Sequence, residues 1–409
     1  MSLECRFCNH SLEHNFVDLG MSPLSNAYLK VEHINCAEKF YPLHTYVCEN
    51  CFLVQLEEFE TPEDIFSDYA YFSSYSDTWL NHAKNYTELM VEQLGLNKTS
   101  QVIEIASNDG YLLQYFQKKG IPVLGIEPAA NVAKVAEEKG IPSLVKFFGV
   151  QTAKDLVSEG KQADLLLGNN VLAHVPDLND FVAGMKIILK PQGILTMEFP
   201  HVLQLIQNNQ FDTIYHEHFS YFSFLTVEKI FATHGLTLFD VEELSTHGGS
   251  LRIYGRHSDG DGKISHRVRE LKAKEIQARL NQIETYLGFG EKVKSIKRDL
   301  LSFLIDAKNQ GKSIVGYGAP AKGNTLLNYC GIRTDLIDYV VDRSPHKQGL
   351  FLPGTHIPIY NPDKVEETKP DYLLILPWNI KDEIIEQMAH IREWGGQFVV
   401  PIPQVEVIG

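Results

Sequence analysis

The chain has 409 residues, with 37 Lys and Arg against 52 Asp and Glu, so its formal net charge is −15 at pH 7. This acidic balance argues against a nucleic-acid partner, because such proteins carry a basic surface for phosphates. The length suggests two to four domains. No run approaches the roughly 20 apolar residues of a membrane span, and M-S-L-E-C-R lacks a secretory signal, so we expect a cytoplasmic protein without a membrane partner.

Four of the six cysteines form two C-x-x-C pairs, Cys5 with Cys8 and Cys48 with Cys51. Two such knuckles supply four thiolates, which is the ligand set of a closed, structural zinc site. The long segment between them can hold an inserted loop. A disulfide alternative is weaker, because we expect a reducing compartment. The sequence therefore predicts an N-terminal zinc-binding module over residues 1–66.

The stretch Phe66–Trp79, F-S-D-Y-A-Y-F-S-S-Y-S-D-T-W, is dense in aromatic rings and hydroxyl groups. Such a segment either packs between domains or forms an amphipathic wall for a ligand, and the residues alone favour neither.

The stretch Val102–Leu113, V-I-E-I-A-S-N-D-G-Y-L-L, predicts a short strand over Val102–Ile105, a polar turn, and a helix that begins near Tyr111. A second strand over Val123–Ile126 ends on Glu127. This βαβ opening is typical of a doubly wound sheet with a nucleoside pocket at the carboxyl ends of its strands. An ordinary βα turn is the alternative.

The cofactor that suits this turn is S-adenosylmethionine. Of the G-x-G-x-x-G fingerprint only Gly110 is present, which disfavours NAD. The Glu127 carboxylate can accept hydrogen bonds from both hydroxyls of a ribose, and S-adenosylmethionine has a ribose but no pyrophosphate. The residues that we expect to bind this cofactor around the turn are Glu104, Ala106, Ser107, Asn108, Gly110, Glu127 and Pro128.

An alternation of strands and helices continues through residues 67–255, which predicts a central Rossmann-like methyltransferase sheet. The further strands expected are Leu144–Phe147, Asp164–Leu167, Ile194–Phe199, Leu236–Leu244 and Ser250–Gly255, the helices are Ala130–Lys139 and Leu178–Leu189, and the turn is Lys190–Gly193. After the strand Asp164–Leu167, the side chains of Asn169, Asn170 and His174 are expected beside the cofactor. A polar strand end without function is the alternative.

The cluster Tyr215-His216-Glu217-His218 is the strongest candidate for chemistry. It could be a surface histidine run, a metal site with His-x-His spacing, or a general acid–base group. A histidine has an unperturbed pKa of ~6.5, so it can accept a carbon-bound proton near neutral pH. Glu217 could position or polarise a neighbour, and Tyr215 could hydrogen-bond an oxygen on which charge develops.

The remaining residues, 256–409, predict a helical linker and a smaller C-terminal α/β lobe. Ile264–Ile305 is helical in composition, with expected breaks at Gly288 and Gly290. A strand–loop–helix over Ser313–Tyr329 follows, and then strands at Ile337–Val341, Tyr372–Leu376 and Gln397–Pro401.

Two glycine-rich segments could bind substrate. Thr246–Arg252, T-H-G-G-S-L-R, permits close backbone approach to a ligand. Gly316–Thr325, G-Y-G-A-P-A-K-G-N-T, places Lys322 near a helix N-terminus, a good position for a phosphate. A structural turn is the alternative for the second segment, and NAD binding in this lobe is a further one.

The chain resembles the sugar C-methyltransferases in a series of motifs and in their order. These are the C-x-x-C pairs, E-I-A-S-N-D-G-Y-L, N-N-V-L-A-H-V-P-D, Y-H-E-H-F-S-Y, H-G-G-S-L-R and G-Y-G-A-P-A-K-G-N. The resemblance covers essentially the whole chain and implies the three-domain form. It implies S-adenosylmethionine-dependent C-methylation of a nucleoside-diphosphate-linked keto-deoxysugar, which binds between lobes.

The resemblance also implies roles for individual residues. It makes His218 the base, with Tyr215 and Glu217 as its partners. The substrate-binding residues expected on this basis are Tyr69, Tyr71, Ser74, Tyr75, His247, Gly248, Lys322 and Asn324. Two rival functions are an RNA or protein methyltransferase with a zinc recognition module, and a zinc scaffold with a degenerate cofactor fold. The sequence gives no indication of oligomeric state.

Overall fold

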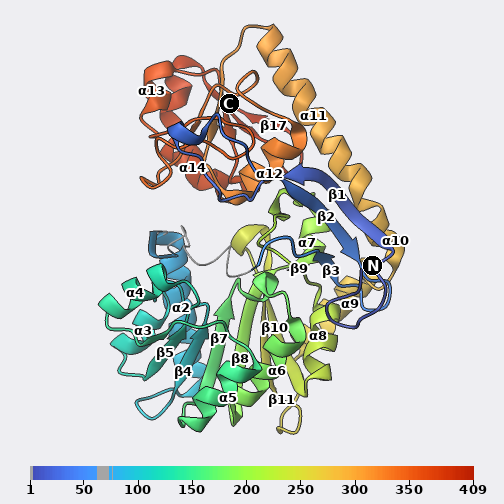
Figure 1. Cartoon of the computed structure of the whole chain (residues 1–409), viewed down its shortest axis with the longest axis vertical. Helices are drawn as coiled ribbons and strands as arrows, with labels where there is room; N and C mark the ends of the chain where they lie inside the picture. Colours follow the sequence, from blue (N-terminus) through green and yellow to red (C-terminus); the bar gives the residue numbers. More distant parts are fainter. Residues whose placement is uncertain (1–2, 62–72, 76) are drawn as a thin grey trace.

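The computed structural model describes residues 3–61, 73–75 and 77–409, and three sheets organise them (Figure 1). The N-terminal sheet is antiparallel and has the order β1-β2-β3-β9. Its strands are β1 His14–Ser22, β2 Tyr41–Val47, β3 Val54–Leu56 and β9 Ser220–Tyr221, and the short helix η1 Val31–His33 lies between the first two. The fourth strand comes from far along the chain, where Val54 pairs with Tyr221. The N-terminal sheet therefore holds the residues that directly follow the Tyr215–His218 cluster.

The central sheet has seven strands in the order β10-β11-β8-β7-β4-β5-β6. They are β4 Val102–Ile105, β5 Val123–Ile126, β6 Ser143–Leu144, β7 Ala163–Asn169, β8 Leu189–Pro200, β10 Leu236–Leu244 and β11 Ser250–His257. From β6 to β8 all strands are parallel, and β11 runs antiparallel to both neighbours. Because β5 and β7 flank β4 on opposite sides, the order reverses at β4, which is where such sheets bind ligands.

Helices cover both faces of the central sheet (Figure 1). They are α2 Asp77–Leu94, α3 Leu113–Lys118, α4 Ala130–Glu138, α5 Val150–Ser158, α6 Leu178–Ile188, α7 Val202–Gln207 and α8 Phe224–Thr233, with the shorter η2 Ser73–Tyr75, η3 Leu172–His174, η4 Phe211–Thr213 and η5 Thr246–Gly248. The central parallel strands are mostly apolar because both faces are buried; all four residues of β4 are buried, and Glu104 is the polar one among them.

The C-terminal lobe is a second, smaller α/β sheet with the order β14-β13-β12-β15-β16-β17, in which only β17 is antiparallel. Its strands are β12 Ile314–Tyr317, β13 Val340–Val341, β14 Ile359–Tyr360, β15 Tyr372–Ile375, β16 Gln397–Val400 and β17 Glu406–Ile408. Its helices are α12 Ala321–Cys330, α13 Lys364–Thr368, η6 Trp378–Ile380, α14 Lys381–Gln387 and η7 Ala389–Trp394, and the linker forms α9 His266–Gln277, α10 Ile283–Leu287 and α11 Phe289–Asn309.

Several local predictions differ from the structure, among them the strand Ile337–Val341, which shrinks to Val340–Val341. The predicted strand Leu144–Phe147 shrinks to Ser143–Leu144, because the chain then leaves the sheet and Phe147 is 41% exposed. The predicted turn Lys190–Gly193 lies inside β8, as an irregularity between the paired residues Leu189 and Ile194. The first helix begins at Leu113 rather than near Tyr111. Gly288 separates α10 from α11 as expected, but Gly290 lies within α11.

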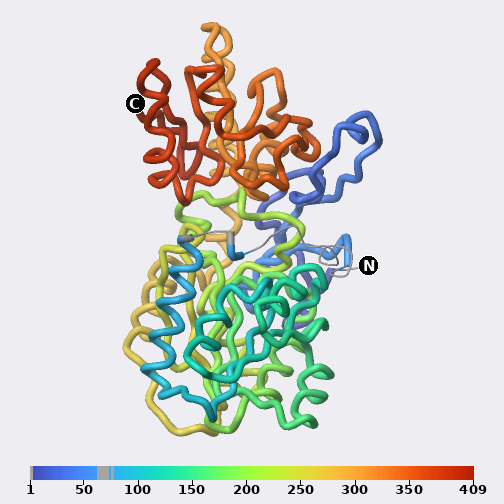
Figure 2. The backbone as a smooth tube through the Cα atoms, turned by 90° about the vertical axis from the view of Figure 1, so that its left-hand side faces the viewer, coloured from blue at the N-terminus to red at the C-terminus, as the bar shows by residue number. Residues whose placement is uncertain are grey.

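The N-terminal sheet packs on the C-terminal lobe as well as on the central sheet. Phe16 of β1 stacks on Phe289 of α11, with ring centroids 4.7 Å apart, and both belong to one buried core with the strands of the C-terminal sheet. Figure 1 shows α11 running along β1 up to the C-terminal lobe. Figure 2 shows the C-terminal lobe above the central part of the molecule, with N-terminal residues beside both. The domain boundaries at residues 66 and 255 stay a prediction. Within the described part of the chain, no helix combines the length and apolar character needed to cross a membrane.

Candidate active site and metal centre

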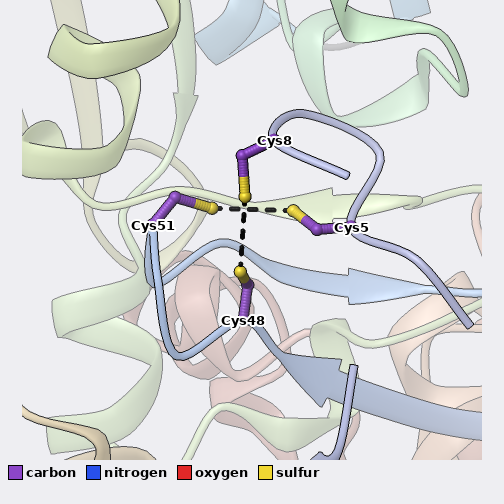
Figure 3. Close-up of side chains that lie close together, drawn as sticks. All are labelled: Cys5, Cys8, Cys48 and Cys51. Atoms are coloured by element: carbon purple, nitrogen blue, oxygen red, sulfur yellow. Dashed lines mark hydrogen bonds between the residues drawn. The ribbon is translucent and has the colours of Figure 1, made fainter. Parts of the chain in front are cut away.

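The four knuckle cysteines converge on one point (Figure 3). Their Sγ atoms all lie within 4.8 Å of one another, and the pairs Cys5–Cys51 and Cys8–Cys48 are each 3.6 Å apart. Zinc–thiolate bonds of ~2.3 Å in a tetrahedron place sulfur atoms about 3.8 Å apart. All four cysteines are free thiols, so the disulfide alternative is not what the structure shows. The donor set therefore fits one closed, structural zinc ion.

Side chains around the cysteines stabilise thiolates and join the centre to the rest of the protein. Gln55 Nε2 donates to Cys5 Sγ at 3.2 Å, and Asn50 Nδ2 donates to Cys8 Sγ at 3.5 Å. Such bonds orient metal ligands. The Thr226 hydroxyl of α8 donates to the carbonyl of Cys51 at 3.0 Å. The metal centre is thus tied directly to the central sheet's helices.

The turn after β4 has an unusual backbone that its sequence explains. Ala106, Asn108 and Gly110 have φ values of 56°, 49° and 74°, in the left-handed region. At Gly110 a Cβ would lie 2.3 Å from Cδ1 of Ile141, so only glycine fits. At the end of β5, Glu127 accepts hydrogen bonds from the backbone N–H of Asn108 at 2.8 Å. The turn is therefore fixed against the acidic residue that follows the second strand.

Glu127 retains the capacity to bind a ribose. The second carboxylate oxygen accepts from the Ala129 N–H at 2.9 Å, and the side chain is 5% exposed at the carboxyl edge of the sheet. Burial raises the pKa of Glu127, and the two backbone bonds oppose this rise. Because a carboxylate has about four acceptor positions, two remain for hydroxyl groups. This donor and acceptor arrangement fits the nucleoside part of S-adenosylmethionine.

The other expected cofactor residues of this turn lie beneath or beside it. Glu104 is fully buried in β4, and burial holds its pKa well above the usual range, against a hydrogen bond with the Tyr111 hydroxyl. Ser107 is buried against Gly125 of β5, and a Cβ added to Gly125 would lie 2.3 Å from the Oγ of Ser107. Pro128 is half-buried next to Glu127. Contact between Glu104 and the cofactor stays a prediction.

The residues after β7 connect the cofactor turn to the Tyr215–His218 cluster. Asn169 Nδ2 donates to the Tyr111 hydroxyl at 3.4 Å, and Asn170 Nδ2 donates to Nε2 of His247 at 3.0 Å. The rings of His174 and His218 meet edge to face, with centroids 4.7 Å apart. Side chains that the sequence separated into three motifs are therefore neighbours at one edge of the sheet.

The His218 side chain is held as a neutral imidazole. Its Nδ1–H donates to the backbone carbonyl of Thr213 at 3.1 Å, which leaves the lone pair on Nε2. Burial, followed by the nearby His174 and His247, holds the pKa of His218 well below its usual range. The Tyr215 ring lies against the imidazole, with centroids 4.1 Å apart. At neutral pH the imidazole is therefore ready to accept a proton.

Glu217 and His216 point to different surroundings. The Glu217 carboxyl is 5% exposed and accepts a hydrogen bond from Nδ2 of Asn26 at 2.6 Å. Burial raises its pKa to about 7, against the effect of Asn26. His216 turns toward the N-terminal sheet, where its Nε2–H donates to the carbonyl of Pro42 at 3.3 Å. Among the described residues, the four cysteines are the one cluster that could hold a metal ion, so the His-x-His metal alternative finds no support.

Lys322 brings the C-terminal lobe to the same site. Its Nζ donates to Oδ1 of Asn379 at 2.8 Å and lies 4.6 Å from the ring centroid of Trp378. Burial lowers the pKa of Lys322, while the nearby Asp212 carboxylate opposes this. Trp378 Nε1 donates to Asp212 at 2.7 Å, so the two lobes meet through buried polar groups.

The other expected substrate residues have mixed surroundings. His247 and Gly248 lie in η5, and a Cβ on Gly248 would be 2.6 Å from the Trp378 ring of the C-terminal lobe. Asn324 is buried, and its Nδ2 donates to the carbonyl of Ser25 at 2.6 Å. The Ser74 hydroxyl accepts from Lys139 Nζ at 3.0 Å, beside the cofactor turn.

The aromatic segment Phe66–Trp79 lies largely outside the described residues. Tyr69 and Tyr71 belong to this part, and of Tyr75 only the backbone at the end of η2 is described. Its last residue, Trp79, stacks on the Tyr111 ring, with centroids 6.0 Å apart, and meets the His247 ring edge to face, with centroids 5.3 Å apart. This end of the segment therefore faces the site.

Three family models together match nearly the whole chain. Residues 5–66 match the family described as "Putative zinc binding domain", residues 80–241 match "Methyltransferase domain", and residues 245–403 match "C-methyltransferase C-terminal domain". The chain is 35% identical over 405 residues to the C-methyltransferase NovU of Streptomyces niveus, covering 99% of this chain and 96% of that protein.

The chain belongs to the C-methyltransferase family. The predictions of an S-adenosylmethionine-dependent C-methyltransferase, of its three-part α/β fold and of a structural zinc are thereby confirmed.

More distant proteins match less than half of this C-methyltransferase. The ubiquinone biosynthesis O-methyltransferase of Bartonella tribocorum is 28% identical over 96 residues, which is 23% of this chain and 39% of that protein. The PH0226 protein from Pyrococcus horikoshii has a TM-score of 0.38 at 16% identity, with coverage of 49% of this chain and 99% of that one. The magnesium protoporphyrin IX methyltransferase of Synechocystis, solved with SAH, has a TM-score of 0.34 at 13% identity, with 48% and 92% coverage.

Several residues at the site of this C-methyltransferase were not expected from the sequence. Asn26 bonds to Glu217, Asp212 and Trp378 join the lobes, and Glu198 of β8 accepts from His82, Thr246 and Arg252 while fully buried. Only Asp212 carried a usable signal, because it stands three residues before Tyr215.

Proposed function

We propose that this C-methyltransferase methylates a nucleoside-diphosphate-linked keto-deoxysugar at the carbon next to the ketone, with His218 as the base. The observation that carries the proposal is the neutral His218 imidazole, tied through Nδ1 to the Thr213 carbonyl and left with its lone pair on Nε2. A carbon acid needs such a base, whereas an oxygen or nitrogen acceptor is already nucleophilic.

The residues of the site divide the work of this reaction. S-adenosylmethionine supplies an electrophilic methyl group when it is bound. His218 Nε2 takes the proton from the acidic carbon, the electron pair of that C–H bond forms the C=C bond of the enolate, and the π pair of the ketone moves to its oxygen. Tyr215 or Glu217 donates a hydrogen bond to this oxygen, where negative charge develops. The enolate carbon would then bond to the methyl group, while the electron pair of the S–CH₃ bond stays on sulfur. Positioning two bound reactants is worth as much as ~7–11 kcal/mol.

Burial has two opposing effects on His218 as a base. The burial that lowers its pKa makes it a weaker base than an exposed histidine, but it also keeps it unprotonated at neutral pH. The same dry surroundings strengthen each hydrogen bond to the substrate oxygen. The acid limb of the activity profile is therefore expected well below pH 6.5.

Support for a sugar nucleotide as substrate comes from the inter-lobe position of Lys322. The ammonium group lies within electrostatic reach of both His218 and His247, so it can pair with a phosphate of a ligand whose sugar reaches the base. We also propose that residues 1–66 hold zinc, 67–255 the cofactor and 256–409 part of the substrate.

The contacts of the zinc module favour a role in supporting the Tyr215–His218 cluster over recognition of RNA or protein. Its strand β3 pairs with β9, directly after His218, and its residue Pro42 binds His216. We propose a cytoplasmic location, because four free thiols that bind metal need a reducing compartment.

The test measures hydrogen exchange separately from methyl transfer. Nucleoside diphosphate 4-keto sugars are incubated in D₂O with wild-type enzyme and with His218→Asn, and exchange at the acidic carbon is followed by NMR with and without S-adenosylmethionine. We expect His218→Asn to lose both exchange and methylation. The exposed His266→Asn at the start of α9 is the matched control and should keep both. Exchange at the wild-type rate in His218→Asn would remove this residue from the role of base.

A further inference from the structure

A loop of the zinc-binding module, residues 22–29, lies between the Tyr215–His218 cluster and the C-terminal lobe. We call it the N-terminal loop. The Tyr28 hydroxyl donates to the Ala319 carbonyl at 2.6 Å, and Leu29 forms an isolated bridge with Phe351. Asn324 Nδ2 donates to the Ser25 carbonyl at 2.6 Å. The C-terminal lobe thus fixes this loop on both sides of Asn26.

Asn26 makes the loop's contact with the site. Its Nδ2 donates to Oε1 of Glu217 at 2.6 Å, and its Oδ1 lies 3.4 Å from the Tyr28 hydroxyl, whose hydrogen goes to the closer Ala319 carbonyl. Asn26 is therefore held as a donor toward one chosen oxygen of Glu217.

The titratable groups around Glu217 come from three elements. His216 and His218 flank it in sequence, the His174 ring of η3 is hydrogen-bonded to its backbone, and Tyr28 of the N-terminal loop lies within electrostatic reach. Tyr28 itself has a raised pKa because it is buried. All four of these groups are uncharged at neutral pH, so Asn26 is the polar partner that acts on the carboxyl group.

We propose that Asn26 is a positioning residue for C-methylation, which holds Oε1 of Glu217 as an acceptor so that Oε2 carries the carboxyl proton toward the substrate oxygen. A carboxylic acid that accepts an N–H bond on one oxygen keeps its proton on the other. The zinc-binding module then contributes to the reacting centre through a side chain as well as through its metal. This inference rests on the proposed function, in which Glu217 supports the enolate oxygen.

The test compares pH profiles of carbon-bound hydrogen exchange in wild-type, Asn26→Leu and Asn26→Asp enzymes. Leucine keeps the side chain's size without a donor, and aspartate keeps its shape with an acceptor in place of the donor. If protonated Glu217 is the active form, wild-type activity falls above pH 7, near its pKa of about 7. Loss of the Asn26 donor destabilises the ionised form of Glu217 and raises its pKa. We therefore expect the alkaline limb of the pH profile to move to higher pH by about one to two units. The plateau should fall by about 10-fold through lost orientation.

A structural role is separated by three measurements. An apparent pKa does not depend on the amount of active enzyme, so partial unfolding leaves it unchanged. In a Glu217→Gln background, Asn26→Leu should have no further effect on the limb, because the two residues act as a unit. Asn309→Leu and Asn309→Asp, at an exposed position of α11, are the matched controls and should keep the wild-type profile.

The outcomes of the two proposals are distinguishable. The positioning role would be overturned if both Asn26 variants kept the alkaline limb of the wild-type pH profile. It would also be overturned if Asn26→Leu changed the pH profile equally in the wild-type and the Glu217→Gln backgrounds. Absence of exchange in the wild-type enzyme with every nucleotide sugar would instead overturn the proposed function. Zinc content, measured in each variant, should stay at the wild-type level.

Discussion

Replacement of Glu217 by Gln is expected to stabilise the protein in a pH-dependent way. The carboxyl group is 5% exposed, and burial raises its pKa from 4.5 to about 7. The side-chain oxygen that accepts from Asn26 persists in glutamine, so the variant removes the ionisation and keeps the hydrogen bond. The difference between the two proteins therefore reports the cost of ionising this one buried group.

The size of the effect follows from the two pKa values. Each pKa unit corresponds to about 1.4 kcal/mol, so a rise from 4.5 to about 7 amounts to about 3 kcal/mol. The stability that protonated Glu217 provides is fully present below pH 4.5 and is lost as the pH rises through about 7. Glu217→Gln should thus gain about 3 kcal/mol relative to wild type between pH 4.5 and pH 8.

Thermal unfolding of both proteins in a series of buffers from pH 5 to pH 8.5 measures this difference. About 2.5 kcal/mol of the difference develops between pH 5 and pH 8.5. A cooperative unit of 150–250 residues shifts by roughly 2–4 °C per kcal/mol, so the gap in Tm should widen by about 5–10 °C across the series. The comparison of Tm values at each pH cancels the other buried groups, including Asp212. A gap that stays constant across the series would show that Glu217 titrates at its ordinary pKa, and the argument from burial would be wrong.

Two further predictions concern the metal centre and the cofactor turn. Cys48→Ser should lose zinc and loosen the pairing of β3 with β9, seen as metal loss by elemental analysis and faster hydrogen exchange in β9, whereas the exposed Cys36→Ser should match wild type in both. Gly110→Ala should weaken S-adenosylmethionine binding by at least about 10-fold in calorimetry, because its Cβ meets Ile141 in addition to a left-handed backbone cost of about 1–2 kcal/mol. Gly120→Ala has nearly the same φ and nothing within 4 Å, so equal affinity losses in the two variants would contradict the steric explanation.

Three strands of the central sheet could be predicted from the sequence with accurate bounds. Val102–Ile105, Val123–Ile126 and Leu236–Leu244 match the expected residues at both ends. The first two are buried on both faces, so their composition alone separates them from the polar turns that follow. The zinc ligands could be predicted for a similar reason, because the spacing within each knuckle is local.

Elements that depend on distant partners could not be predicted. β9 has only two residues, and they form a strand because Val54 and Gln55 pair with them. The irregularity at Lys190–Gly193 likewise depends on the register between β7 and β8. Helix α11 tolerates Gly290 because the apolar face that follows it is anchored by packing, which overrides a weak local propensity.

The same distinction applies to the candidate site. Tyr215, Glu217 and His218 stand together in the sequence, so their chemistry could be considered as a group; their roles stay a prediction. Asn26 and Glu217 are 191 residues apart, and only the fold brings them within 2.6 Å. No local pattern near Asn26 marks it, because an asparagine between serine and alanine is common in loops.

The segment around Glu217 belongs to the central part of the chain and is hydrogen-bonded to both the N-terminal module and the C-terminal lobe. The Thr325 hydroxyl of α12 donates to the Ile214 carbonyl at 3.0 Å, and the Leu56 N–H donates to the Phe219 carbonyl at 3.0 Å. A chimeric enzyme that takes only the central methyltransferase part from one relative would lose the match between the partners of these hydrogen bonds. Productive recombination between relatives therefore requires that the N-terminal loop, the Tyr215–His218 cluster and the start of α12 be inherited together.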